Sequence, residues 1–257
     1  MSFVARTSPR SSFMNENIAD PKQAFKGKIA LVTGASKGIG LAIAKRLAAE
    51  GCDLIITARS MAALEEASRE LLACPVRVLA KVCDVSKLSD VDSLFNFVRQ
   101  QCERLDILIN NAGISHAMAN IDHMAPEVWE RVIGTNLTGM FLVTRAALPL
   151  MGAGSTIVNN ISVKAVFAGE AAYCASKHGA LALTNTLREE VRPKKIRVIA
   201  LIPGATNTEI WNQFWPEAPR TNMMSPETIG NAVISALLLP ADTSMDELVI
   251  NPVTGTL

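Results

Sequence analysis

The chain has 257 residues, of which 49% are hydrophobic and 19% are charged, and its formal net charge is +1. This length allows one large α/β domain or two small ones, with enough apolar residues for a core. The charge balance gives no sign of nucleic-acid or membrane-surface binding, and no apolar run reaches the ~18 residues of a membrane span. The five cysteines are never spaced C-x-x-C, which indicates buried thiols in a cytoplasmic, reducing environment and neither a disulfide frame nor a metal site.

Residues 1–26 differ from the rest of the chain. Ser, Arg, Asn and Pro are mixed with isolated apolar residues, and the apolar centre of a secretory signal is missing. We interpret this segment as a flexible N-terminal tail, with an organelle transit peptide as the alternative. Residues 27–257 are then expected to form a single catalytic domain.

From Lys28 onward, short β-branched runs alternate with longer helical stretches. Strands are predicted at 29–32, 53–57, 76–82, 106–110, 155–160, 196–202 and 247–250. Helices are predicted over 41–50, 61–73, 86–101 with Ser86 as N-cap, 126–151, 173–191 and from Pro226 onward. Such short, continuously apolar strands are expected where helices cover both faces of a parallel sheet. The order predicts a Rossmann-like, doubly wound α/β sheet of about seven strands.

A glycine-rich turn follows the first predicted strand. Gly34, Gly38 and Gly40 lie in TGASKGIG (33–40), directly before the first helix. Glycine lets a backbone approach a pyrophosphate closely, and the N–H groups at a helix start bind anions. A tight strand–helix connection is the alternative, but the position in the first βαβ unit favours a dinucleotide site.

The end of the second strand distinguishes the two nicotinamide cofactors. NAD-binding proteins usually place a carboxylate there, whereas this chain has Ala58 followed by Arg59. An arginine can bind a 2′-phosphate, and Lys37 supplies a second cation in the turn. The two bases favour NADP over NAD, although they could also be ordinary surface charges.

Tyr173 and Lys177 are spaced i and i+4, so a helix places them on one face. A free tyrosine is a poor base at neutral pH because its pKa is ~10. A fixed ammonium nearby would stabilise the phenolate and lower that pKa. The alternative is a half-buried tyrosine that packs on the lysine stem.

Together these motifs resemble the compact, single-domain branch of the short-chain dehydrogenase/reductase family, from about Lys28 to Ile250. The resemblance rests on seven motifs in the family's order: TGASKGIG (33–40), Asp84, NNAG (110–113), Asn136 in TNLTG, Ser162 in NNIS, Tyr173 with Lys177, and Pro203-Gly204 with Thr208.

The resemblance implies an oxidoreductase that transfers a hydride between NADP(H) and a carbonyl or secondary alcohol. Tyr173 would be the acid–base and Ser162 would orient the reacting oxygen. Lys177 would bond the nicotinamide ribose and lower the Tyr173 pKa, and Asn136 would hold a water that leads to solvent. The implied cofactor contacts are Gly34, Ser36, Lys37, Gly38, Ile39, Gly40, Arg59, Asp84, Val85, Asn111, Ala112, Gly113, Tyr173, Lys177, Pro203, Gly204, Thr206 and Thr208.

Two other functions stay open. A 3-oxoacyl-carrier-protein reductase would use the same catalytic residues, but no basic patch for an acidic carrier is concentrated in the sequence. A non-catalytic NADP(H)-binding sensor or scaffold is disfavoured because all four catalytic positions are filled. We expect a small-molecule substrate, a homodimer or homotetramer, and neither a metal nor a nucleic-acid or membrane partner.

The segment 207–224 occupies the family's place for a mobile lid. It carries Trp211, Phe214, Trp215, Met223 and Met224. So many apolar side chains suggest a lid that closes on a substrate with apolar bulk, and packing against the body or another subunit is the alternative. His116 is expected at the edge of the pocket.

Overall fold

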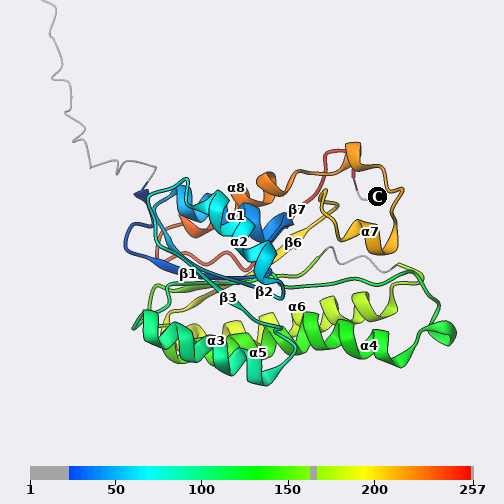
Figure 1. Cartoon of the computed structure of the whole chain (residues 1–257), viewed down its shortest axis with the longest axis horizontal. Helices are drawn as coiled ribbons and strands as arrows, with labels where there is room; N and C mark the ends of the chain where they lie inside the picture. Colours follow the sequence, from blue (N-terminus) through cyan, green and yellow to red (C-terminus); the bar gives the residue numbers. More distant parts are fainter. Residues whose placement is uncertain (1–22, 163–166, 256–257) are drawn as a thin grey trace, which may run out of the picture.

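The computed structural model describes residues 23–162 and 167–255. Its centre is a seven-stranded parallel sheet in the order β3-β2-β1-β4-β5-β6-β7 (Figure 1). The strands are β1 (Ile29–Thr33), β2 (Asp53–Ala58), β3 (Val78–Val82), β4 (Ile107–Asn110), β5 (Thr156–Asn160), β6 (Arg197–Pro203) and β7 (Glu247–Ile250). The strand order reverses direction between β1 and β4, and a crevice for ligands is expected where the carboxyl ends of these strands diverge.

Helices cover both faces of the sheet, as the continuously apolar strands predict (Figure 1). One layer holds α1 (Gly38–Ala49), α2 (Met61–Leu71) and α8 (Pro226–Leu237). The other holds α3 (Leu88–Gln101), α4 (Pro126–Ile133), α5 (Gly139–Ala147) and α6 (Ala171–Val191). The Rossmann-like fold predicted from the sequence is confirmed.

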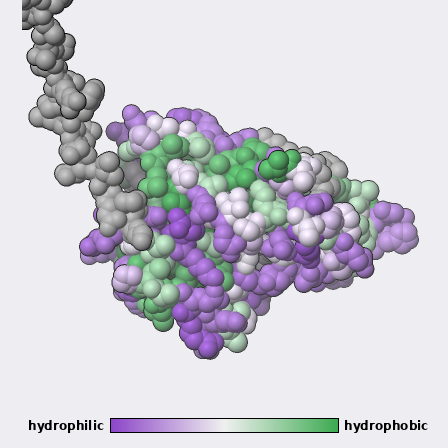
Figure 2. All heavy atoms as spheres, turned by 90° about the horizontal axis from the view of Figure 1, so that it is seen from above, coloured by the Kyte–Doolittle hydropathy of each residue, from purple (hydrophilic) through white to green (hydrophobic). Residues whose placement is uncertain are grey.

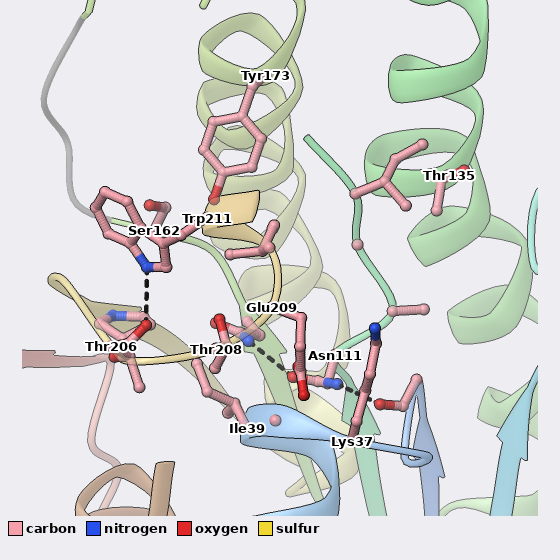
Figure 3. A pocket seen from close by; sticks show the side chains of 18 of the residues that line it. Lys37, Ile39, Asn111, Thr135, Ser162, Tyr173, Thr206, Thr208, Glu209 and Trp211 are labelled. Atoms are coloured by element: carbon pink, nitrogen blue, oxygen red, sulfur yellow. Dashed lines mark hydrogen bonds between the residues drawn. The ribbon is translucent and has the colours of Figure 1, made fainter. Parts of the chain in front are cut away.

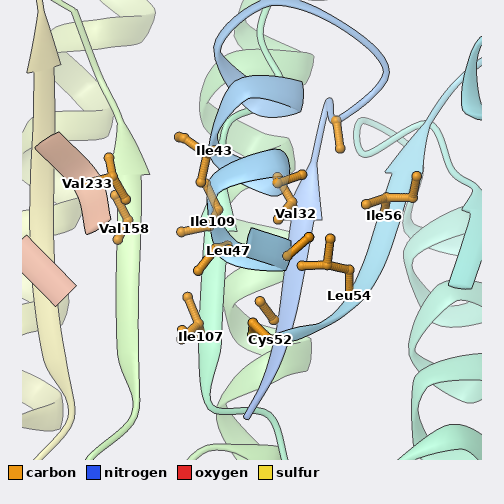
Figure 4. Packing of buried hydrophobic residues seen from close by; sticks show 14 of the residues in the cluster. Val32, Ile43, Leu47, Cys52, Leu54, Ile56, Ile107, Ile109, Val158 and Val233 are labelled. Carbon is orange, nitrogen blue, oxygen red and sulfur yellow. The ribbon is translucent and has the colours of Figure 1, made fainter. Parts of the chain in front are cut away.

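Each strand in the middle of the sheet buries residues in two cores. In β1, Ala30 and Val32 join the cluster beneath α1, α2 and α8, whereas Leu31 joins the cluster on the opposite face. Figure 4 shows the first cluster, where Ile43 and Leu47 of α1 lie against the strands. Because side chains alternate along a strand, both sets are apolar only when both faces are covered.

The outer face of the α1 and α8 layer carries both hydrophilic and hydrophobic areas (Figure 2). Within the described residues, no helix is long and apolar enough to cross a bilayer. α1 and α8 each bury one face against the sheet and leave the other face at the surface.

The region predicted as one long helix over 126–151 is divided. α4 ends at Ile133, a π-helical segment occupies Gly134–Thr138, and α5 follows. The N–H of Gly139 donates to the carbonyl of Gly134, five residues back, which defines the π turn. Gly134, the first residue of this segment, and Gly139, directly after it, have low helix propensity, and Gly139 also approaches Val85 closely.

Two further expectations need correction. Ser86 is not the N-cap of α3: Lys87 is, and the Ser86 hydroxyl donates to Asp84 Oδ1 at 2.7 Å. Residues 23–26 of the predicted tail belong to the folded body, since Phe25 is 7% exposed in the core and its N–H donates to the Glu50 carbonyl. Residues 1–22 lie outside the described residues.

Candidate active site

A cavity of about 660 Å³ opens at the carboxyl ends of the six strands β1 to β6. Every expected cofactor residue except Gly40 lines it, and so do three of the four expected catalytic residues, Ser162, Tyr173 and Lys177. The fourth, Asn136, lies behind the wall. The fold therefore brings residues from six parts of the sequence to one edge of the sheet, as expected for an open α/β sheet.

The glycine-rich turn forms one wall of the cavity. Gly34 and Gly38 adopt φ values of +62° and +56°, which residues other than glycine rarely adopt. A Cβ on Gly34 would lie 2.8 Å from Ala112 Cα, and one on Gly40 would clash with the Gly34 carbonyl oxygen. Gly40 thus permits helix–turn packing and is no direct cavity contact.

The start of α1 faces this wall. Lys37 is the N-cap residue, and its side chain makes no capping bond to the first turn. The side chain of Thr208 packs over the turn, since its Cγ2 would lie 3.2 Å from a Cβ on Gly38. A helix N-terminus with free N–H groups and a hydroxyl above it is a suitable place for a phosphate.

At the end of β2, Ala58 is the last strand residue and Arg59 lines the cavity with an exposed side chain. Lys37 is also exposed and lines the same cavity. These two cations are thus available to a polyanion.

Asn111 links the glycine turn to the neighbouring strands (Figure 3). Its Nδ2 donates to the carbonyls of Thr33 and Gly34 at 3.0 Å, and its Oδ1 accepts from Asn160 at 2.9 Å. Asn110, considered above only as part of NNAG, donates instead to side chains of the core, Thr144 and Asn159. Asn111 therefore fixes the backbone around the cavity, whereas Asn110 connects β4 to α5 and β5.

Tyr173 lies in the first turn of α6, and its hydroxyl points into the same part of the cavity as Ser162 (Figure 3). Lys177 follows one turn later on the same face. Its Nζ is 5.6 Å from the centre of the Tyr173 ring and donates to the Asn160 carbonyl at 2.9 Å. The helix thus holds phenol and ammonium side by side, as predicted.

The pKa of Tyr173 is raised, whereas the sequence predicts that it is lowered. Burial raises the pKa of Tyr173 to about 12, and the Ser162 side chain opposes this rise. Burial also lowers the pKa of Lys177 to about 8. Desolvation dominates both shifts because both groups lie in the same enclosed site.

Asn136 occupies the π-helical segment and is 1% exposed. Its Oδ1 accepts from the Ile114 N–H, and its Nδ2 donates to the Ile114 carbonyl and the Ser176 hydroxyl. A Cβ on Gly113 would lie 3.5 Å from both Asn136 Oδ1 and Lys177 Nζ. Asn136 therefore joins the strand-to-loop segment after β4 to the helix that carries Lys177.

A stability measurement can test the burial of Lys177. In the unfolded chain the lysine keeps a pKa near 10.5, so between pH 8 and 10.5 the unfolded state binds more protons than the folded state. The free energy of unfolding of wild type relative to Lys177→Met should therefore rise across this window, by on the order of 2–3 kcal/mol. Urea unfolding at several pH values measures it.

The exposed Lys87 provides the control for this experiment. The Lys87→Met variant should keep a constant difference from wild type across the same window. Both lysine variants retain Tyr173, so the loss of stability that its raised pKa causes above pH 10 cancels in the comparison. If the difference in unfolding free energy between wild type and Lys177→Met does not change with pH, the Lys177 ammonium is not desolvated in wild type.

The lid segment contains a short helix, α7 (Trp211–Phe214), which the sequence does not predict. The Trp211 and Phe214 rings stack with centroids 4.8 Å apart, and Trp211 Nε1 donates to the Thr206 carbonyl at 2.8 Å. These two rings and Trp215 line the cavity. Met224, in contrast, packs on the core beneath α1 and α8, so part of the lid segment lines the cavity and part packs against the body.

The structure places a buried acid, Glu170, near Tyr173, which the sequence analysis does not predict. Glu170 is 2% exposed, lines the cavity and accepts a hydrogen bond from the Ser115 hydroxyl at 3.1 Å. His116 is buried close to it and is not among the cavity-lining residues, contrary to expectation. Its place three residues before Tyr173 is the one signal in the sequence for Glu170, and the burial of Glu170 beside Ser115 becomes visible only in the fold.

Groups of histidine, cysteine and acidic residues suited to a metal ion are absent from the described part of the chain.

Comparison with known proteins agrees with this geometry. The family model for short chain dehydrogenases matches residues 28–219. Dehydrogenase/reductase SDR family member 4 of Rattus norvegicus is 34% identical over 77% of this chain and 72% of its own length. The chain therefore belongs to the short-chain dehydrogenase/reductase family of oxidoreductases.

Two solved structures are similar over almost their whole length. An alcohol dehydrogenase from the archaeon Thermococcus sibiricus, complexed with 5-hydroxy-NADP, has a TM-score of 0.81 and 30% identity, and the match covers 88% of this chain and 97% of that one. The 3-ketoacyl-(acyl-carrier-protein) reductase from Brucella melitensis, complexed with NADH, has a TM-score of 0.80 and 30% identity, over 89% and 98% of the two chains.

Proposed function

We propose that this chain transfers a hydride between NADP(H) and a carbonyl or secondary alcohol, with Tyr173 as the acid–base. One observation carries the proposal: the Tyr173 hydroxyl and Ser162 lie where the part of the cavity lined by the glycine turn meets the part lined by the lid. A cofactor held by the first part and a substrate held by the second would meet at these two hydroxyls.

The fit of the cavity to a dinucleotide supports the cofactor class. Glycines 34 and 38 leave room for a pyrophosphate above the free N-terminus of α1. The solved relatives are complexed with an NADP derivative in one case and NADH in the other, so the preference for NADP rests on Arg59 and Lys37 of this chain. A bound nicotinamide supplies the hydride.

The protein would supply position and a proton. Ser162 would bond the carbonyl oxygen and hold it beside Tyr173, and the phenol would donate its proton to that oxygen. The raised pKa of Tyr173 keeps the phenol protonated at neutral pH, which is the form needed for reduction.

Lys177 and Asn136 would assist this proton transfer without contacting the carbonyl oxygen. Lys177 is 7% exposed and would contact the nicotinamide ribose, while its ammonium limits the cost of any phenolate that forms. Asn136 binds both sides of the Ile114 peptide and Ser176, so its primary role is to position. The water that Asn136 would hold remains a proposal.

The test is the oxidation of NADPH in the presence of a panel of aldehydes, ketones and one 3-oxoacyl thioester. The loss of NADPH absorbance measures the rate. Turnover of simple ketones above that of the thioester supports the general reductase, whereas a strong preference for the thioester supports the carrier-protein reductase. NADPH binding without turnover of any carbonyl would contradict catalysis and favour a sensor or scaffold.

A further inference from the structure

Glu170 is a buried acid at the substrate end of the cavity. The side chains around this end are largely apolar and include Met118, Phe167, Trp211 and Phe214. A carboxylate in such a wall is unfavourable unless its oxygens are hydrogen-bonded. Its presence therefore requires an explanation.

Only one of its two oxygens is explained by the protein. Oε2 accepts from the Ser115 hydroxyl at 3.1 Å. Oε1 is buried and has no hydrogen-bond partner among the residues that the structure describes. Glu170 as a whole is 2% exposed, so bulk water does not readily serve this oxygen.

The neighbouring histidine cannot easily satisfy Oε1 in its neutral form. His116 Nδ1 lies 2.8 Å from the Ala117 carbonyl and must carry its hydrogen there. Neutral His116 then presents a lone pair at Nε2, which is also buried without a partner. Two acceptors face an environment that lacks a donor.

The pKa of Glu170 is raised above its ordinary value, chiefly by burial, and two neighbours offset part of this rise. Burial raises its pKa, while His116 and the hydrogen bond from Ser115 lower it. The hydrogen bond from Ser115, and His116 when it is protonated, favour the carboxylate, the form that accepts hydrogen bonds at both oxygens.

The lid is connected to this acid. Ser115, which holds Oε2, donates its backbone N–H to Oε1 of Gln213 in α7 at 3.3 Å. Trp211 and Phe214 of the same short helix line the cavity beside Glu170. In the arrangement seen here, the lid and the acid therefore enclose one space next to Tyr173.

We infer that Glu170 determines substrate specificity: its Oε1 accepts a hydrogen bond from an O–H or N–H group that the carbonyl substrate carries in addition to its reacting carbonyl. The inference deepens the proposed function and rests on it. The substrate class is accordingly a hydroxy or amino ketone or aldehyde with an apolar body, and a protonated amine would gain most from the carboxylate.

Matched ketones test this inference. Hydroxyacetone is compared with butanone, and para-(hydroxymethyl)acetophenone and para-(aminomethyl)acetophenone are compared with para-ethylacetophenone. Wild type should show a kcat/KM about tenfold or more higher for the donor-bearing member of at least one pair, because a site built around a hydrogen bond rejects analogues that lack it. The neutral and charged acetophenones distinguish a hydroxyl from an ammonium substrate.

Two variants complete the experiment. In Glu170→Gln the amide oxygen keeps the bond from the Ser115 hydroxyl, so the NH₂ group, a donor, takes the place of Oε1. The ratio within each pair should then fall close to one, with NADPH binding unchanged, while Glu170→Asp should keep part of the preference. Glu217→Gln, an exposed lid residue outside the cavity, removes the same charge and should leave the ratios as in wild type.

The outcomes separate the two proposals. Equal kcat/KM values within every pair for wild type, or a preference that survives Glu170→Gln, would overturn the role of Glu170 while leaving ketone reduction intact. If Glu170→Gln does not fold, as judged by NADPH binding, the wild-type ratios and the Asp variant decide. A wild type that reduces no ketone contradicts the proposed function instead.

Discussion

Replacing Tyr173 by phenylalanine is expected to lower kcat for ketone reduction by about 10²–10⁴-fold, the range of a lost general acid. The substitution removes one hydroxyl and keeps the ring that lies beside Lys177. NADPH binding, measured by the change in NADPH fluorescence, should stay within about twofold of wild type, since the glycine turn and Arg59 are untouched.

Tyr173 is also the single tyrosine of the chain, which gives the experiment an independent readout. The ultraviolet absorbance change of phenolate formation should appear in wild type with a midpoint near pH 12 and be missing from the Phe variant. The exposed Phe141→Ala variant should retain both activity and titration. Undiminished turnover by Tyr173→Phe would refute the acid–base assignment.

Replacing Arg59 by aspartate is expected to reverse the cofactor preference. A hydrogen bond to a charged group contributes ~1.5–3 kcal/mol, which corresponds to roughly 10–150-fold in affinity. The new carboxylate would in addition repel a 2′-phosphate while accepting bonds from ribose hydroxyls. We expect kcat/KM for NADPH to fall about 100-fold and that for NADH to change by less than about tenfold.

The same change on a distant arginine controls for net charge. Arg99 lies on the exposed side of α3 and donates to Asn96, away from the cavity. Arg99→Asp should leave the ratio of NADPH to NADH turnover as in wild type. A wild type that already prefers NADH, or an Arg59→Asp variant with the original ratio, would disprove the NADP assignment.

Much of the fold could be predicted because the strands are unusually uniform. All seven predicted runs coincide with strands to within two residues at each end. Runs such as IALV and ILIN are apolar at successive positions, a pattern that suits strands covered on both faces. The glycine turn and the Tyr173–Lys177 pair follow from local spacing, and local spacing is what a sequence displays directly.

The remaining features depend on contacts between distant segments. The π-helical segment around Asn136 has a sequence that also suits an α-helix, and the two are distinguished by the backbone bond from Gly139 to Gly134. The direction of the Tyr173 pKa depends on enclosure by several segments, which no single segment reveals. Glu170 becomes notable only when Ser115, 55 residues earlier, is seen beside it.

The π turn also has a consequence for the geometry of the helical layer. A π turn accommodates one residue more than an α turn of similar length, so it changes the angular phase of the helix that follows. The buried side of α4, marked by Val132, and that of α5, marked by Val143 and Ala147, both meet the protein interior across this break. If 134–138 were α-helical with no residue removed, the α5 side chains would be rotated by ~100° out of register with the core. The π-helical segment that holds Asn136 thus also keeps the buried sides of α4 and α5 both turned toward the core.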